Sequence, residues 1–160
     1  MKSLMYRISM FIFPILIYGQ QTDSEIKIKI DLLIKVSDSI GKSAKEGISE
    51  GEIKYDHISG KFGWEGYFLN DANDKKKPLR IRYSETQPNS NEDLNLYYQN
   101  GILVFAELIS SPNSRKSKYN NTKSKYFYFI GKNVIYPDLT DSDIDYVLQK
   151  EKTIRKMIYE

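Results

Sequence analysis

The residues best suited to binding chemistry lie between Leu108 and Pro137. This stretch has six basic residues and no acidic one, and Tyr119 and Tyr126 are interleaved with the cations. Cationic and aromatic side chains together are typical of surfaces that hold acidic groups, since the charges pair with anions while the rings stack on the ligand. We therefore predict a ligand or partner surface formed by Arg115, Lys116, Lys118, Tyr119, Lys123 and Lys125.

A plainer interpretation of this stretch is a solvated loop. Residues 110–122 are rich in Ser, Asn and Pro, which favours an irregular connection. A group of aspartates follows in the chain and could neutralise the cations: Asp138, Asp141, Asp143 and Asp145. If the cations do bind a partner, we expect an acidic glycan or a protein whose identity the sequence does not reveal.

Catalytic chemistry has few candidates in this sequence. The chain has no Cys, which excludes thiol nucleophiles, disulfides and thiolate metal sites, and a single His, His57, which excludes a multi-His metal site within a monomer. His57 lies in an alternating strand-like pattern, where we expect a structural role. The sequence also lacks a glycine-rich loop suited to phosphate. We accordingly expect no catalytic residue, no metal and no cofactor.

Carboxylates are the one remaining catalytic option. Five acidic residues lie on or beside predicted strands: Glu65, Glu85, Glu92, Asp93 and Glu107. A small hydrolase could use two of them as acid and base, which requires a cleft with two close carboxyl groups whose pKa values are shifted. A flat sheet covered on one face by helices would argue against this alternative.

The first 19 residues predict a secretory signal peptide. Lys2 and Arg7 precede an uncharged, mostly apolar stretch over residues 8–18, and Gly19 suits the −1 position of a cleavage site. The stretch has 11 residues, against the ~20 that cross a bilayer, and a proline interrupts it. We therefore expect residues 20–160 to be secreted or periplasmic, without a transmembrane segment. An uncleaved anchor or a buried N-terminal element is the alternative.

Export would change the charge of the chain. The whole sequence has 24 basic and 21 acidic residues, and two of the basic ones, Lys2 and Arg7, lie in the leader. The mature chain is therefore nearly neutral, with 22 basic residues against 21 acidic ones. It lacks the strongly positive charge of nucleic-acid-binding domains, so we expect no nucleic-acid partner.

Two helices are predicted at the ends of the mature chain. From Thr22 to about Ile40 the aliphatic residues alternate as in a strand, yet several also lie along one helical face and Ser24 could cap it, so helix is favoured over strand. Near the C-terminus, Thr140 and Asp143 form a variant of the capping box. Aspartates gather at the start of this second helix and lysines toward its end, as the helix dipole favours.

Between these helices the chain predicts antiparallel β-structure. Three adjacent aromatic pairs each precede a turn and an apolar strand: Tyr67-Phe68, Tyr97-Tyr98 and Tyr128-Phe129. The middle turn, Asn100-Gly101, is the strongest short hairpin signal, because both positions of a type I′ turn need positive φ. A further strand is expected near residues 52–58, after a polar connection over residues 41–51. Since neighbours on a strand point to opposite faces, each pair places one ring on each side, and the outward rings pack under a helix or offer a binding face.

The expected architecture is one α+β domain over residues 20–160, in which an antiparallel meander of about five to seven strands is flanked by an N-terminal and a C-terminal helix. Its expected core includes Ile81, Leu103, Phe105, Val147 and Leu148. We predict an exported, non-catalytic binding or protein-interaction module. The alternatives are a small envelope hydrolase that uses carboxylates and a structural subunit of an envelope complex, of which a large exposed apolar patch would be the sign.

Overall fold

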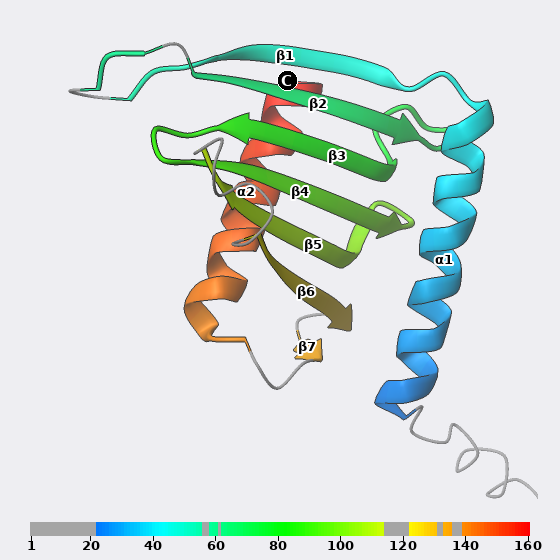
Figure 1. Cartoon of the computed structure of the whole chain (residues 1–160). Coiled ribbons are helices and arrows are strands. Elements are labelled where there is room, and N and C mark those ends of the chain that lie inside the picture. The colour runs from blue at the N-terminus through cyan, green and yellow to red at the C-terminus, as the bar shows by residue number, and fades with distance from the viewer. Residues whose placement is uncertain (1–21, 56–57, 61, 114–121, 131–132, 136–138) are drawn as a thin grey trace, which may run out of the picture.

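The computed structural model describes residues 22–55, 58–60, 62–113, 122–130, 133–135 and 139–160. A helix precedes a run of seven strands, and a second helix follows them (Figure 1). The elements are α1 (Asp23–Ser43), β1 (Gly47–Ile53), β2 (Phe62–Asn70), β3 (Pro78–Thr86), β4 (Ser90–Gln99), β5 (Ile102–Pro112), β6 (Lys123–Ile130), β7 (Asn133–Ile135) and α2 (Asp141–Tyr159).

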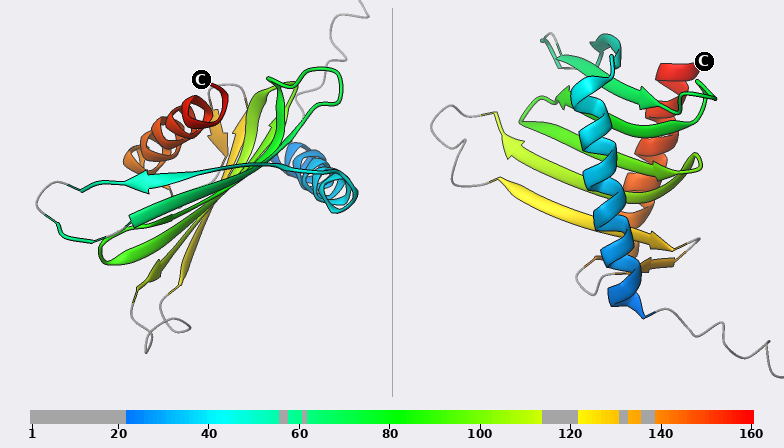
Figure 2. Two further views of the ribbon diagram at one scale, coloured as in Figure 1. Left: turned by 90° about the horizontal axis from the view of Figure 1, so that it is seen from above. Right: turned by 90° about the vertical axis from the view of Figure 1, so that its right-hand side faces the viewer.

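All seven strands form one antiparallel sheet in the order of the chain, from β1 to β7. α1 lies on one face of this sheet and α2 on the other (Figure 2). The predicted α+β fold, an antiparallel meander flanked by N-terminal and C-terminal helices, is therefore confirmed.

The turns follow the chemistry of their residues. Between β4 and β5, Asn100 and Gly101 both adopt positive φ, at 54° and 78°, as the Asn-Gly pair predicts. In the longer β2–β3 connection, the carboxylates of Asp71 and Asp74 accept hydrogen bonds from backbone N–H groups two residues further on, at 2.7 and 3.0 Å.

The first strand lies earlier than predicted. β1 covers residues 47–53. It therefore begins within the stretch 41–51 that was expected to be a polar connection and overlaps only the first two residues of the strand expected near residues 52–58. Its glycines do not serve as turn residues but give space to aromatic rings of β2. A Cβ atom at Gly47 would lie 2.2 Å from the Phe68 ring, and one at Gly51 would lie 2.6 Å from Trp64 Nε1.

Both faces of the sheet carry a hydrophobic core. Toward α2, the buried residues include Ile81, Leu96 and Phe127 of the sheet and Val147 and Ile154 of the helix. Toward α1, a smaller cluster joins Ile30 to three rings of the sheet, Tyr97, Phe105 and Tyr128. The predicted division of the aromatic pairs is confirmed, because Phe68, Tyr98 and Phe129 pack toward α2 while Tyr97 and Tyr128 pack toward α1.

Four of the five predicted core residues take part in these clusters. Ile81, Phe105 and Val147 are buried, and Leu103 packs against the core as a partly buried residue. The prediction was wrong for Leu148, which is 42% exposed. Its position on α2 is turned about 100° from Val147, and Val147 is the residue that faces the sheet.

The two helices begin at capping boxes. In α1, the side chain of Thr22, rather than the predicted Ser24, caps the helix and pairs with Glu25 at the third position. In α2, Thr140 and Asp143 make the predicted box. Helix is therefore the correct choice for the ambiguous N-terminal segment. The helical face that favoured this choice consists of Ile26, Ile30, Leu33 and Ile40. The first three pack on the sheet, whereas Ile40 is 40% exposed.

A buried ion network fastens the C-terminal end of α1 to the sheet. The Arg80 side chain, 6% exposed, pairs with Asp38 of α1, and its Nη2 lies 2.7 Å from Glu46 Oε1. Tyr97 Oη also donates to Asp38, at 3.0 Å. The guanidinium lies against the helix backbone at Gly41, where a Cβ atom would come within 2.1 Å of Arg80 Nη2.

This close approach makes Gly41→Ala a sharp test of the network. In an exposed helix position, Ala for Gly would raise the free energy of unfolding by about 1 kcal/mol. Here we expect a decrease of about 1–3 kcal/mol, because the methyl group displaces a buried guanidinium from its carboxylates. Urea denaturation measures the change, with Ser39→Ala at an exposed position of the same helix as the control, expected within about 0.5 kcal/mol of wild type. A more stable Gly41→Ala protein would contradict the arrangement.

Candidate functional site

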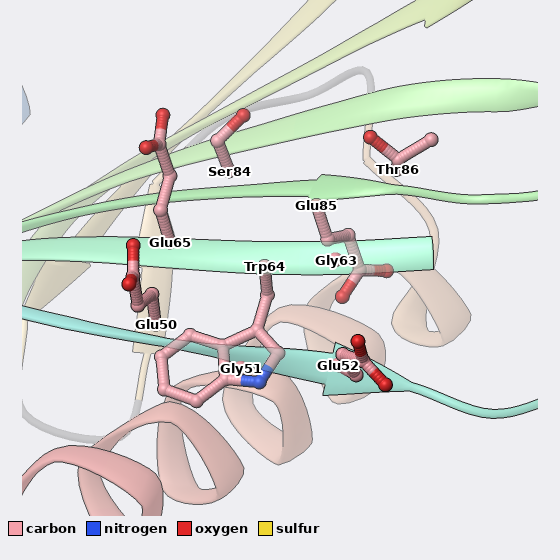
Figure 3. Close-up of a pocket in the computed structure, with 9 residues that line it drawn as sticks. All are labelled: Glu50, Gly51, Glu52, Gly63, Trp64, Glu65, Ser84, Glu85 and Thr86. Carbon is pink, nitrogen blue, oxygen red and sulfur yellow. The ribbon is translucent and has the colours of Figure 1, made fainter. Parts of the chain in front are cut away.

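A cavity of about 540 Å³ lies where β1 and β3 end and β2 begins (Figure 3). By strand alternation Trp64 and Glu85 point toward α2, whereas Glu65 and Ser84 point to the opposite side. The cavity therefore opens along the strand ends rather than within one core. Its lining residues are Glu50, Gly51, Glu52, Gly63, Trp64, Glu65, Ser84, Glu85 and Thr86.

The lining is acidic. Four of its nine residues are glutamates and none is basic. Glu50 and Glu65 occupy directly opposite positions on β1 and β2, and like charges in that relation repel. Among the described residues, no Lys or Arg nitrogen lies within 4 Å of either carboxylate. Glu65 accepts a long hydrogen bond from Tyr67 Oη, at 3.4 Å.

An indole ring lines the α2 side of the cavity, on the face of the sheet opposite Glu50 and Glu65. Trp64 lies opposite Gly51 on β1 and opposite Glu85 on β3. The absence of a side chain at Gly51 leaves the space that the indole occupies, and Tyr83 stacks against the ring at 5.9 Å between centroids. The ring is thus held in place from two sides and borders the cavity from the α2 side.

Glu85 forms the wall of the cavity nearest α2. It is 5% exposed and accepts three hydrogen bonds, from Tyr83 Oη at 2.7 Å, Gln87 Nε2 at 2.6 Å and Lys150 Nζ at 2.6 Å. Burial raises the pKa of this carboxyl group, but the bonds from Lys150, Gln87 and Tyr83 outweigh burial, so its pKa lies below the usual value.

Glu92 lies opposite Glu85 on β4 and shares its cation. Lys150 Nζ is 3.6 Å from Glu92 Oε1, and Tyr146 Oη is 2.7 Å from each carboxylate oxygen. Burial raises the pKa of Glu92 above its usual value, and the contacts with Tyr146 and Lys150 offset this only in part. Two neighbouring carboxyl groups therefore have pKa values shifted in opposite directions.

This pair has the shifted pKa values that the hydrolase alternative requires, but it lacks the open cleft. Glu92 is 6% exposed and does not line the cavity. Each oxygen of Glu85 already accepts a hydrogen bond from Lys150, Tyr83 or Gln87. A substrate would have to displace these bonds to reach the pair. The arrangement joins α2 to the sheet through ion pairs.

The other predicted carboxylates are not brought together. Asp93 lies on the α1 side of β4 and accepts a hydrogen bond from Ser84 Oγ at 2.5 Å. Glu107 accepts one from Asn95 Nδ2 at 2.9 Å. Glu50 and Glu52 were not among the candidates. Glu50 lies in the segment 41–51, which was expected to be a connection, and Glu52 lies at the start of the strand expected near residues 52–58.

The predicted basic surface is only partly described by the structure. Arg115, Lys116, Lys118 and Tyr119, together with His57, lie outside the described residues. Lys123 and Lys125 stand at the start of β6. Lys125 Nζ lies 2.7 Å from Asp143 Oδ1, and this bond lowers the pKa of Asp143. One cation of the surface is therefore neutralised by one of the aspartates expected to do so.

Comparison with protein-family models, with curated proteins and with solved structures gave no significant match. In the described part of the chain, no group of three or more His, Asp or Glu residues is arranged to hold a metal ion. Neither described helix is long and apolar enough to span a membrane.

The opposite pKa shifts predict different effects of removing each charge. Glu85→Gln should lower the free energy of unfolding by about 1–3 kcal/mol at neutral pH, because it weakens the buried contact with Lys150. Glu92→Gln should cost less than about 1 kcal/mol or stabilise the protein, because its charged form is disfavoured by burial. Urea denaturation of both variants measures the difference.

The same shifts set the direction of the pH dependence. The stabilisation from Glu85 is present above the ordinary carboxyl pKa and is lost as the pH falls through the lowered pKa. The contribution of Glu92 to stability depends on pH in the opposite direction. It is present at low pH and is lost as the pH rises through the raised pKa of Glu92. The stability gap between wild type and Glu85→Gln should therefore narrow on acidification. Equal losses in the two variants at neutral pH would contradict these assignments.

Proposed function

We propose that the protein is an exported, non-catalytic binding module whose acidic cavity receives a cationic group of its partner. The observation that supports this most directly is the cross-strand pair Glu50 and Glu65, which has no cation within 4 Å among the described residues. On the neighbouring strand pair, Glu85 and Glu92 stand in the same relation but share Lys150. A cationic group of the partner would neutralise Glu50 and Glu65 in the way that Lys150 neutralises Glu85 and Glu92.

The neighbouring groups indicate which cation fits. By strand alternation Glu50 and Glu65 lie on the face of the sheet opposite Trp64, so an ammonium or guanidinium group paired with them would contact carboxylate and hydroxyl oxygens rather than the indole. Ser84 and Thr86 bring two hydroxyl groups to the same cavity. A Lys or Arg side chain carries such a cation at the end of a long, flexible apolar stem.

The position of β1 favours a protein segment as the carrier of this side chain. In the described part of the chain β1 is an edge strand, with β2 as its only neighbour. An extended segment could add to that edge by backbone hydrogen bonds and place alternate side chains beside Glu50 and Glu52. The proposed partner is therefore a protein with an extended basic segment.

Two further parts of the proposal rest on sequence. Export follows from the predicted signal peptide over residues 1–19. The basic stretch with Arg115, Lys116 and Lys118 stays a prediction for a second contact, with an acidic glycan or an acidic partner surface. Because its charge is opposite to that of the cavity, the two surfaces would not compete for one ligand.

Trp64 is the only tryptophan in the chain, so its fluorescence reports directly on the cavity. We expect tri-lysine or tri-arginine peptide to change its emission in a saturable way, while tri-glutamate has no effect. The double variant Glu50→Gln/Glu65→Gln should bind the basic peptides about tenfold more weakly, because two charge contacts are lost.

The matched control removes the same two charges elsewhere, at exposed Asp145 and Glu160 of the C-terminal region, as Asp145→Asn/Glu160→Gln. It should bind as wild type does. The proposal is wrong if the cavity variant and the control bind equally well, or if neither basic peptide alters the emission of wild type.

A further inference from the structure

α1 has a second apolar face that points away from the sheet. Ile28, Leu32, Val36 and Ile40 recur at four-residue intervals and are 67%, 62%, 51% and 40% exposed. The inner face of the helix packs on the sheet through Ile26, Ile30, Leu33 and Ile34. We call the four exposed residues the outer stripe. Four aliphatic side chains exposed in one row of a helix form a contiguous patch rather than scattered surface residues.

The acidic and basic side chains of α1 lie on different sides of the helix. The acidic residues of the middle and end of α1 turn toward the sheet, where Asp31 accepts a hydrogen bond from Tyr128 Oη at 3.0 Å and Asp38 pairs with Arg80. By contrast, Lys29, Lys35 and Lys42 are exposed. Past the first turn, which carries Asp23 and Glu25, the outward surface of α1 is therefore apolar and cationic.

The shape of this surface is a ridge rather than a groove. In both views of Figure 2, α1 is the outermost described element on its face of the sheet, and no described element covers it. A convex row of aliphatic side chains flanked by lysines fits a flat, deformable surface that is apolar inside and negatively charged at its boundary. α1 is also the first described element after the apolar residues 8–18. If that stretch is the predicted signal peptide, its attachment to the bilayer before cleavage would hold α1 close to the lipid surface.

We propose that the outer stripe docks α1 on a bilayer that contains anionic phospholipid. The helix would lie in the plane of the interface, with the outer stripe in the acyl boundary and the lysines at the phosphate groups. This surface is separate from the acidic cavity, so the proposal goes beyond the proposed binding function and does not depend on it.

A second copy of the chain fits the outer stripe less well. A stable dimer usually buries roughly 800 Å² on each partner, and one row of four side chains is well short of that area. Antiparallel pairing of two α1 helices would also bring their exposed lysines together while the acidic partners of the helix remain engaged with the sheet.

The test is flotation of the exported protein with lipid vesicles, after its N-terminus has been determined by mass spectrometry. One set of vesicles is phosphatidylcholine alone and the other contains phosphatidylglycerol. The key variant is Ile28→Gln/Leu32→Gln/Val36→Gln, in which Gln preserves helix propensity. The control is Ile48→Gln/Ile102→Gln, which removes two aliphatic side chains, each 63% exposed, outside α1.

We expect wild type and the control to float with the phosphatidylglycerol vesicles, and the triple variant to partition at least about tenfold more weakly. Lys29→Gln/Lys35→Gln should reduce the preference for anionic vesicles, and added salt should do the same. Circular dichroism would establish that each variant keeps its helices.

Three results would overturn the proposal. One is the absence of wild-type binding to anionic vesicles. The second is binding that the triple variant retains in full, since the leader or another region would then be responsible. The third is a dimeric mass by light scattering that the triple variant reduces to a monomer, without vesicle binding, which would make the outer stripe a contact between copies.

Discussion

The fold depends on two ion clusters, each formed around a buried charge of β3 and lying on opposite faces of the sheet. Arg80 and Glu85 are five residues apart on β3, and an odd separation sends their side chains to opposite faces of the sheet. Arg80 meets Asp38 and Glu46 at the C-terminal end of α1, whereas Glu85 meets Lys150 of α2. The apolar clusters supply most of the burial on each side. The ion pairs determine where each helix lies along the strands, because a buried charge without its partner is costly.

The position of the cavity follows from the same arrangement. α1 crosses its face of the sheet near the start of β3, the strand that carries Arg80 (Figure 1). The cavity is lined by Ser84, Glu85 and Thr86 at the other end of that strand. On the α2 side, Lys150 reaches Glu85 and Glu92 and compensates their repulsion. On the other side, α1 does not extend to Glu50 and Glu65, and their repulsion is not compensated by a described cation. The face of the acidic cavity that carries Glu50 and Glu65 therefore lies beyond the end of α1, while its other face is reached by Lys150 of α2.

Local signals predicted the fold well, and long-range contacts explain where they failed. The Asn100-Gly101 turn and the capping box at Thr140 each depend on residues that are close together in the sequence, so the sequence alone predicted both. The pairing of Glu85 with Glu92 also had a local signal, since both lie at equal distances from the turn at Pro88-Asn89. The pairing of Glu50 with Glu65 had none, because it requires the register of β1, whose glycines resemble a connection until the rings of β2 that fill their space are known.

The ambiguity of the N-terminal segment has a physical origin in the two faces of α1. Aliphatic residues at every second position, from Ile26 to Val36, are typical of a strand. On a helix, the same residues separate into two rows with four-residue spacing. Ile26, Ile30 and Ile34 then pack on the sheet, while Ile28 and Leu32 belong to the outer stripe. A helix that is apolar on both sides needs a partner on both sides to be fully covered. The sheet covers one of the two rows. The alternation in the sequence resembles a strand because the second row, the outer stripe, is also aliphatic and faces away from the sheet.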